Sequence, residues 1–204
     1  MMSRISRTTI LIATIILSAC TPNKEKSAQT GSSQIVSKEQ SDFRIIADQQ
    51  EQDTIKGSIK ARAMGTVGDA ISINYYSPAV RGRIIWGGLV PYDQVWVTGA
   101  HRATNIEFDG DMTIGDTSIP AGRYAIFTIP GKTEWTFILN KNWDQHLADD
   151  YDSNQDMVRI KITPITSQQP QERLQYTINT LQDRKGTIKL MWEKVAIEVP
   201  FSAQ

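Results

Sequence analysis

The chain has 204 residues, and 22 Lys and Arg balance 22 Asp and Glu, so its formal net charge is zero. A neutral chain without a basic run or a basic face of aromatics argues against a nucleic-acid partner. The single cysteine excludes a disulfide framework within this chain, so a hydrophobic core must hold the fold.

The first 19 residues have the pattern of a signal peptide. Arg4 and Arg7 precede an uncharged apolar run at 8–17, which is too short to span a bilayer. The run ends in Leu-Ser-Ala-Cys, which resembles a bacterial lipobox with Cys20 as the lipidated residue. The alternative is an ordinary secretory signal beside a chance cysteine. An acylated Cys20 predicts a lipid-anchored protein of the bacterial cell envelope, and Thr21 in place of an aspartate favours the outer membrane.

Residues 20–57 are predicted to be the lipidated cysteine and a flexible tether. Ser, Gln, Lys, Glu and Asp dominate this stretch, which cannot bury enough apolar surface to offset its ordering entropy. The exception is the apolar group at 43–46, interpreted as one turn of helix that docks on the domain or a partner, or as a segment without a role. Residues 58–204 then fit one domain of ordinary size.

The apolar residues of this domain recur with the period of β-strands. Polar and apolar residues alternate along several segments, as in strands with one solvated face. The predicted strands are 70–76, 103–109, 124–129, 135–139, 157–163, 173–180, 186–193 and 194–199. The strands at 124–129 and 135–139 are apolar on both sides, so we expect them to be central and covered. The pattern predicts an all-β fold, a single antiparallel β-sandwich (jelly-roll-like or barrel-like) with one short helix at 142–147.

Turn residues separate the predicted strands. Asp109-Gly110-Asp111 carries the Asp-Gly signal of a hairpin. Gly115-Asp116 and residues 120–122 bracket a short strand, and residues 130–132 and 183–186 form two further turns.

Three stretches of the domain have a distinctive order of residues. They are Ser-Pro…Arg-Gly-Arg…Gly-Gly-Leu-Val-Pro-Tyr at 77–92, Val-Trp…Thr-Gly-Ala at 95–100, and Pro-Ala-Gly-Arg-Tyr at 120–124. In this order they resemble the bacterial family known as domain of unknown function 2911. The resemblance covers about residues 61–200 and implies an exported, often lipid-anchored, largely β domain with no established catalytic residues. Val97 stands where the family usually has Arg, and His101-Arg102 where it usually has Asn-Glu. These departures argue against an enzymatic site shared with relatives.

Residues 77–104 contain the predicted binding site, because arginines, aromatics and a histidine crowd one long loop region. Arg81 and Arg83 flank a glycine, and they would clamp a carboxylate or phosphate or else brace the loop by bonding its carbonyls. The nearby aromatics, which also include Tyr75, Tyr76 and Trp86, would form a ligand platform or pack in the core. The predicted ligand-binding residues are Arg81, Arg83, Tyr92, Trp96, Thr98, His101 and Arg102.

Catalytic and metal sites are also considered. His101 with Asp93 would supply a general base, but no local nucleophile signature accompanies them. Asp150, Asp152 and Asp156 alternate like calcium ligands, although Gln155 and Lys161 stand where an EF-hand loop needs Gly and Glu. The alternative is a polar turn before the next strand. With two histidines and an acylated cysteine, zinc is not expected, and we expect no cofactor.

These features favour a non-enzymatic envelope lipoprotein whose β-sandwich binds a glycan, peptide or small molecule. Two alternatives are a periplasmic hydrolase that uses His101 with a nearby carboxylate, and a structural or assembly partner of other envelope proteins. The sequence leaves the oligomeric state open.

Overall fold

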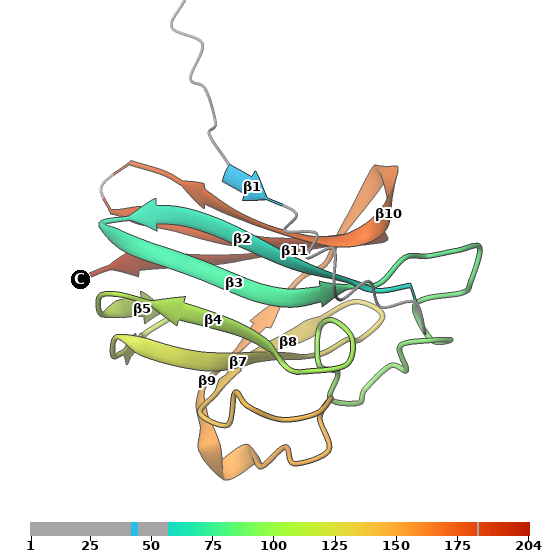
Figure 1. The fold of residues 1–204 in the computed structure, drawn as a ribbon, viewed down its shortest axis with the longest axis horizontal. Helices are drawn as coiled ribbons and strands as arrows, with labels where there is room; N and C mark the ends of the chain where they lie inside the picture. Colours follow the sequence, from blue (N-terminus) through green and yellow to red (C-terminus); the bar gives the residue numbers. More distant parts are fainter. Residues whose placement is uncertain (1–41, 45–56, 183) are drawn as a thin grey trace, which may run out of the picture. The chain divides into compact units, whose positions relative to one another are not determined.

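The computed structural model describes residues 42–44, 57–182 and 184–204, and it forms two antiparallel β-sheets (Figure 1). The first sheet has the order β1-β2-β3-β4-β7-β8-β9, and the second has the order β10-β11-β5-β6. The strands of the first sheet are β1 (Asp42–Arg44), β2 (Ile59–Val67), β3 (Asp69–Ser77), β4 (Thr104–Phe108), β7 (Gly122–Ile129), β8 (Trp135–Asn140) and β9 (Asp156–Ile162). Those of the second are β5 (Met112–Ile114), β6 (Thr117–Ile119), β10 (Ile165–Thr180) and β11 (Lys185–Ala203). The predicted all-β sandwich is confirmed.

The hydrophobic core lies between the two sheets, as the alternation in the sequence predicts. Leu174, Tyr176 and Ile178 of β10 are buried, and so are Ile71 and Ile73 of β3. The residues between these buried positions point to the other face of each sheet, and they are more exposed on β10 than on β3. Apolar burial of this kind is the main stabilising contribution to a fold without disulfides.

The predicted strands at 186–193 and 194–199 form one continuous strand, β11, whose buried face changes at Glu193. Before this residue the even-numbered positions are buried, ending at Trp192, whereas Ile197, Val199 and Phe201 are buried after it. Glu193 has a φ of 54°, which lies in the left-handed region. A local irregularity of this kind shifts the side-chain phase by one residue without ending the strand.

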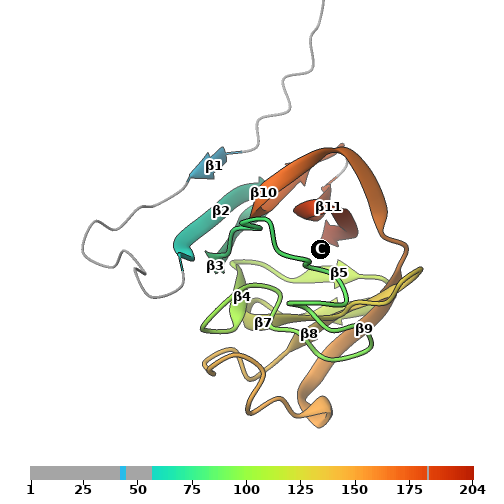
Figure 2. The ribbon, with the colours of Figure 1, turned by 90° about the vertical axis from the view of Figure 1, so that its right-hand side faces the viewer.

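The prediction that two strands are covered on both faces is confirmed for β7 and β8. All six residues of β8 are buried, and so are five consecutive residues of β7. Their second face packs under loop residues in a separate small core of Val97, Ala103, Ala125, Phe127 and Ile138. Figure 2 shows the loop at 141–155 passing beneath β7 and β8, where it contributes Trp143 and Ala148 to this core.

The prediction of a short helix at 142–147 is wrong. This segment is irregular, because its backbone bonds to another part of the chain: the N–H of Leu147 donates to the carbonyl of His101, and the N–H of Ala103 donates to that of Gln145. Tertiary partners therefore replace the i to i−4 hydrogen bonds of a helix. The helical turn of the described residues is a 3-10 turn at Ser153–Gln155.

The predicted hairpin at Asp109-Gly110-Asp111 is also wrong, because it connects β4 of one sheet to β5 of the other. Gly110 packs against Asp69, whose carboxylate occupies the space that a side chain would need. The glycine thus permits a close approach rather than a two-residue turn. The turns predicted at 115–116 and 130–132 do join paired strands, β5–β6 and β7–β8. The strands β10 and β11, near the turn predicted at 183–186, are also paired, and β11 already begins at Lys185.

Part of the predicted tether pairs with the domain, because β1 runs antiparallel to β2. Residues 42–44 therefore form a strand and not a turn of helix. The predicted signal peptide, Cys20 and the rest of the tether lie outside the described residues. Within the part of the chain that the structure describes, no helix is long and apolar enough to cross a membrane.

Candidate functional site

The loop between β3 and β4, residues 78–103, lies at the end of the strands opposite the C-terminus (Figure 1). It contributes two tryptophans to a cluster of four. Trp86 and Trp96 from the loop meet Trp135 of β8 and Trp192 of β11, with ring centroids 4.8 to 6.5 Å apart. Trp96 and Trp192 stack at 5.9 Å with an interplanar angle of 18°. Such ring pairs stabilise a fold beyond their buried area, so this cluster anchors the loop to both sheets.

A pocket of about 480 Å³ opens beside this cluster, and we call it the loop pocket. Its size lies in the range of small-molecule sites. Apolar walls come from Trp96, Trp192, Leu89 and Leu147, and polar groups come from five further residues. The polar lining residues are Ser58, Arg83, His101, His146 and Asp149. Both histidines of the chain therefore line one pocket, although one follows β3 and the other follows β8.

The histidine–carboxylate pair of the loop pocket is His146 with Asp149. Nδ1 of His146 lies 2.8 Å from Oδ2 of Asp149, and both side chains are 63% exposed. The predicted histidine, His101, is half-buried, has a φ of 63°, and places its ring edge-on to Tyr76 at 5.2 Å. Sequence reasoning missed His146, and the three-residue spacing to Asp149 was the signal that would have found it.

The two arginines flanking Gly82 have different positions. Arg83 lines the loop pocket, and its guanidinium also donates to the carbonyls of Ala79 and Val80. Arg81 is exposed, its backbone N–H donates to a carboxylate oxygen of Glu172, and its side chain lies outside the pocket. The pair forms no clamp around a common point, and Arg83 braces the loop as the structural alternative expects.

Thr98 holds the loop in place from a fully buried position. Its hydroxyl donates to the carbonyl of Trp96 and contacts the Thr128 hydroxyl at 3.1 Å. Its carbonyl accepts hydrogen bonds from the hydroxyls of Thr104 and Tyr176, both at 3.0 Å. These bonds explain why the Thr-Gly-Ala segment has a fixed conformation, and they leave Thr98 outside the pocket lining.

The remaining predicted residues are not brought together with His101. Tyr92 packs against Gly87, and Asp93 lies at the β7–β8 turn, where its N–H donates to the carbonyl of Pro130. Neither residue lines the loop pocket. Arg102 is exposed, forms an ion pair with Asp144, and faces a different pocket. Asp93 is therefore not among the residues that line the loop pocket with His101.

Two tyrosines lie beneath the loop and are buried together. Tyr75 and Tyr176 meet edge to face with ring centroids 4.9 Å apart. Burial raises the pKa of Tyr75 to about 12 and raises that of Tyr176 well above its ordinary value. Both phenols thus stay protonated at neutral pH and act as hydrogen-bonding core residues.

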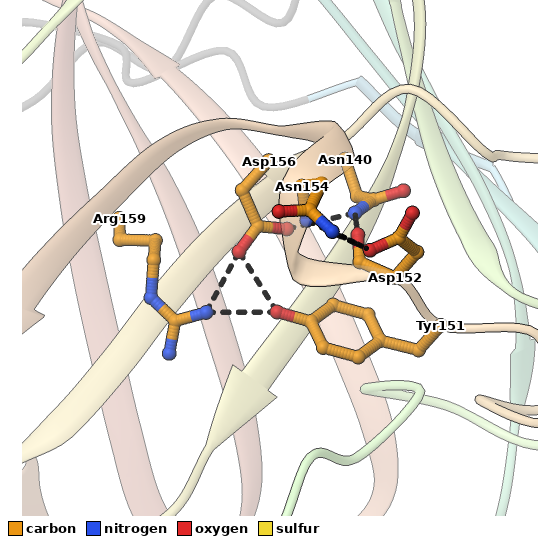
Figure 3. A network of polar contacts seen from close by, with 6 residues as sticks. All are labelled: Asn140, Tyr151, Asp152, Asn154, Asp156 and Arg159. Carbon is orange, nitrogen blue, oxygen red and sulfur yellow. Dashed lines mark hydrogen bonds and ion pairs between the residues drawn. The ribbon is translucent and has the colours of Figure 1, made fainter.

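The aspartates considered for calcium form a structural network (Figure 3). Asp156 is 6% exposed and accepts from the Asn140 amide at 2.7 Å, the Tyr151 hydroxyl at 2.8 Å and the Arg159 guanidinium at 2.7 Å. Asp152 caps the 3-10 turn by accepting from the N–H of Asn154.

Asp150 is exposed and contributes only backbone contacts, since its N–H donates to the side chain of Gln145 and its carbonyl accepts from that of Asn142. Among the residues in the described ranges, no three His, Cys, Asp or Glu side chains converge as metal ligands. The three aspartates are thus accounted for by local structure, as the polar-turn alternative expects.

The fold and the loop pocket define a small all-β domain in which a long loop shapes one end of a two-sheet sandwich. The chain belongs to the family described as Protein of unknown function (DUF2911), whose profile matches residues 58–201. Comparisons with curated proteins and with solved structures gave no match. The family description assigns no activity, so an argument about function depends on the geometry of the pockets.

Proposed function

We propose that this chain is a lipid-anchored envelope protein whose β-sandwich binds a small ligand in the loop pocket. One observation supports the pocket most directly. Trp192 lines it while only 1% exposed, and its indole N–H is buried without a hydrogen-bond partner among the described residues. A buried donor without a partner costs free energy, and an acceptor on a bound ligand or water would relieve that cost.

The chemistry of the lining suits a ligand with an apolar face and a few polar groups. Trp96 and Leu147 supply apolar surface, while His101 and the His146–Asp149 pair supply hydrogen-bonding groups. Sites of this size for small molecules combine these two kinds of lining. A sugar, a short peptide or another small molecule would satisfy them.

A thermal-shift screen against sugars, muropeptides and divalent metals tests this proposal. A ligand that binds only the folded protein raises its melting temperature in proportion to the logarithm of its concentration. Substituting Leu89→Ser at the pocket, where the side chain is 47% exposed, should abolish the shift without unfolding the protein. Leu181→Ser is the matched control, since Leu181 is 52% exposed and lies outside this pocket. A shift that survives Leu89→Ser, or no shift with any compound, would contradict binding here.

One specific observation supports the hydrolase alternative, namely the contact between His146 and Asp149. A histidine oriented by a carboxylate is one part of a general-base device. Among the described residues no serine or threonine hydroxyl is hydrogen-bonded to His146, so a nucleophile would have to be a water molecule. Hydrolysis of an ester or peptide probe that is lost in His146→Gln would support this alternative over binding alone.

The assembly alternative would use the exposed apolar side chains near the same loop. Ile84 is 78% exposed, and Leu89 and Leu147 are also exposed. Side chains of this kind can form a protein contact surface. Concentration-dependent association of the purified chain that Ile84→Ser removes would favour it.

A further inference from the structure

A second pocket lies over the outward face of the first sheet, and Tyr76, which lines it, contacts His101 of the loop pocket. Its volume is about 340 Å³, and we call it the sheet pocket. Side chains from three neighbouring strands form its floor, and the loop at 141–155 provides one wall. The lining residues with polar or aromatic side chains are Lys60, Arg62, Asn74, Tyr75, Tyr76, Arg102, Asn105, Trp143 and Asp144.

The strand register places the polar floor in a row. Arg62 of β2 pairs with Asn74 of β3, and Asn74 pairs with Asn105 of β4. Directly paired residues project from the same face of a sheet, so these three side chains are neighbours. The Asn74 amide donates to that of Asn105 at 3.4 Å, and an amide pair retains further donors and acceptors for a bound hydroxyl.

Among the described residues that line the sheet pocket, cationic side chains outnumber carboxylates. The cations are Lys60, Arg62 and Arg102, and the carboxylate is Asp144, which is already bonded to Arg102. Within the described part of the chain Arg62 forms no ion pair, and its Nε is buried without a hydrogen-bond partner. A guanidinium binds carboxylates with paired hydrogen bonds, so an unpaired one in a concave site suits an anion.

Two aromatic rings flank this positive floor. Trp143 carries the guanidinium of Arg123 over its ring at 4.6 Å, which fixes the indole on the wall. Tyr76 has Lys60 over its ring at 6.0 Å and meets His101 edge-on. Aromatic side chains beside polar amides form a surface on which a ring-shaped ligand can lie.

We infer that the sheet pocket binds a small ring-shaped carboxylate of the acidic-monosaccharide class. In this arrangement Arg62 binds the carboxylate, the Asn74–Asn105 pair binds ring hydroxyls, and Trp143 and Tyr76 contact the faces of the ring. The inference is independent of the loop pocket, because none of these five residues lines that pocket.

Titration of the full chain in detergent with D-glucuronate tests the inference, with D-glucose as the neutral counterpart of the same shape. Calorimetry should show binding of glucuronate and none of glucose. Arg62→Gln should weaken glucuronate binding at least about tenfold, because a charged hydrogen bond is lost. Arg184→Gln, which removes a surface arginine paired with Asp69, is the matched control and should leave binding unchanged.

A second measurement keeps the result clear if Arg62→Gln alters folding. The Nε–H resonance of Arg62 in an NMR spectrum of the wild-type chain should shift on addition of glucuronate and not on addition of glucose. Four outcomes would overturn the inference. The chain binds both sugars, it binds neither, a folded Arg62→Gln variant binds glucuronate as well as the wild type does, or the Arg62 resonance does not respond.

Acetate or phosphate binding as tightly as glucuronate would also overturn it, since the ring would then contribute nothing. Leu89→Ser should not affect this binding, which separates it from the loop pocket.

Discussion

Trp96 and Trp192 stack face to face at 5.9 Å, although one lies in the β3–β4 loop and the other in the middle of β11. This contact fastens the loop to the second sheet, and it also forms a wall of the loop pocket. Stability and site shape are therefore coupled at these two residues.

The first prediction concerns the indole N–H of Trp192. Because this donor has no hydrogen-bond partner among the described residues, Trp192→Phe removes no bond and relieves an unsatisfied N–H. It should therefore cost no more than about 1–2 kcal/mol, the loss expected from the smaller volume. Trp192→Ala should cost about 3–5 kcal/mol. Urea unfolding at neutral pH measures both. A Trp192→Phe loss as large as that of Trp192→Ala would contradict this prediction.

The second prediction concerns Gly99. A Cβ at this position would lie 2.6 Å from Oγ1 of Thr104 and 3.3 Å from the carbonyl oxygen of Tyr76. Oγ1 of Thr104 cannot move without breaking its bond to Thr98, so Gly99→Ala should cost about 1–3 kcal/mol. The same substitution in a Thr104→Ala background should cost less, since the contact is then absent. Additive losses in a double-mutant cycle would refute the clash as the cause.

The third prediction assigns a structural role to Asp156. Asp156→Asn weakens three hydrogen bonds of a nearly buried carboxylate and should reduce the free energy of unfolding by about 1.5–3 kcal/mol. Asp150→Asn, at an exposed carboxylate of the loop that precedes β9, should change it by less than about 0.5 kcal/mol. A calcium-dependent rise in melting temperature that Asp156→Asn abolishes would instead support a metal site.

The fourth prediction is a loss of stability at alkaline pH. The ordinary pKa of tyrosine is 10.0, and burial raises that of Tyr75 to about 12 in the folded protein. Between these values the unfolded chain releases a proton that the folded chain keeps, so the free energy of unfolding falls as pH rises from 10 to 12. Tyr176, whose pKa is also raised by burial, adds to the fall.

Tyr176→Phe provides the check on this cause. The substitution should cost about 1 kcal/mol at pH 7, where the bond to the Thr98 carbonyl is lost, and less at pH 11. Denaturant titrations at the two pH values measure the difference. A cost that stays the same or grows at pH 11 would mean that another group causes the alkaline loss.

The fifth prediction concerns the membrane anchor. If Cys20 is acylated, the wild-type chain expressed in a bacterium should sediment with membranes, and Cys20→Ser should move it to the soluble fraction after signal cleavage. Mass spectrometry of the wild-type N-terminus should find the lipid mass on residue 20. A Cys20→Ser chain that still sediments would point to attachment through another part of the protein.

The sequence predicted most strands because their signal is local, but β2 (Ile59–Val67) was not among the predicted strands. Along β10, alternate residues such as Leu174 and Tyr176 are apolar, and a strand needs only this pattern to bury one face. The continuous apolar run of β8 likewise predicted a strand covered on both sides. The change of buried face at Glu193 could not be predicted, since the sequence shows two alternating segments and no sign that they form one strand.

The predicted site was only partly assembled by the fold. Residues 77–104 do supply Arg83, Trp96 and His101 to one pocket, as expected. Thr98 is instead buried, where it forms hydrogen bonds with Thr128, Thr104 and Tyr176. Arg102 lines the sheet pocket and not the loop pocket. Neighbouring residues in an irregular loop have no fixed periodicity, so the sequence gives no rule for the direction of each side chain.

By itself, the sequence determined the all-β class, the family and most strand positions, because alternation and motif order are properties of the chain alone. It also contains the Leu-Ser-Ala-Cys stretch at 17–20 on which the envelope prediction depends. Only the tertiary structure decided which residues meet: His146 beside His101, Trp192 against Trp96, and Arg62 in register with Asn74 and Asn105. These contacts depend on strand order and loop path, which arise from packing between segments far apart in the chain.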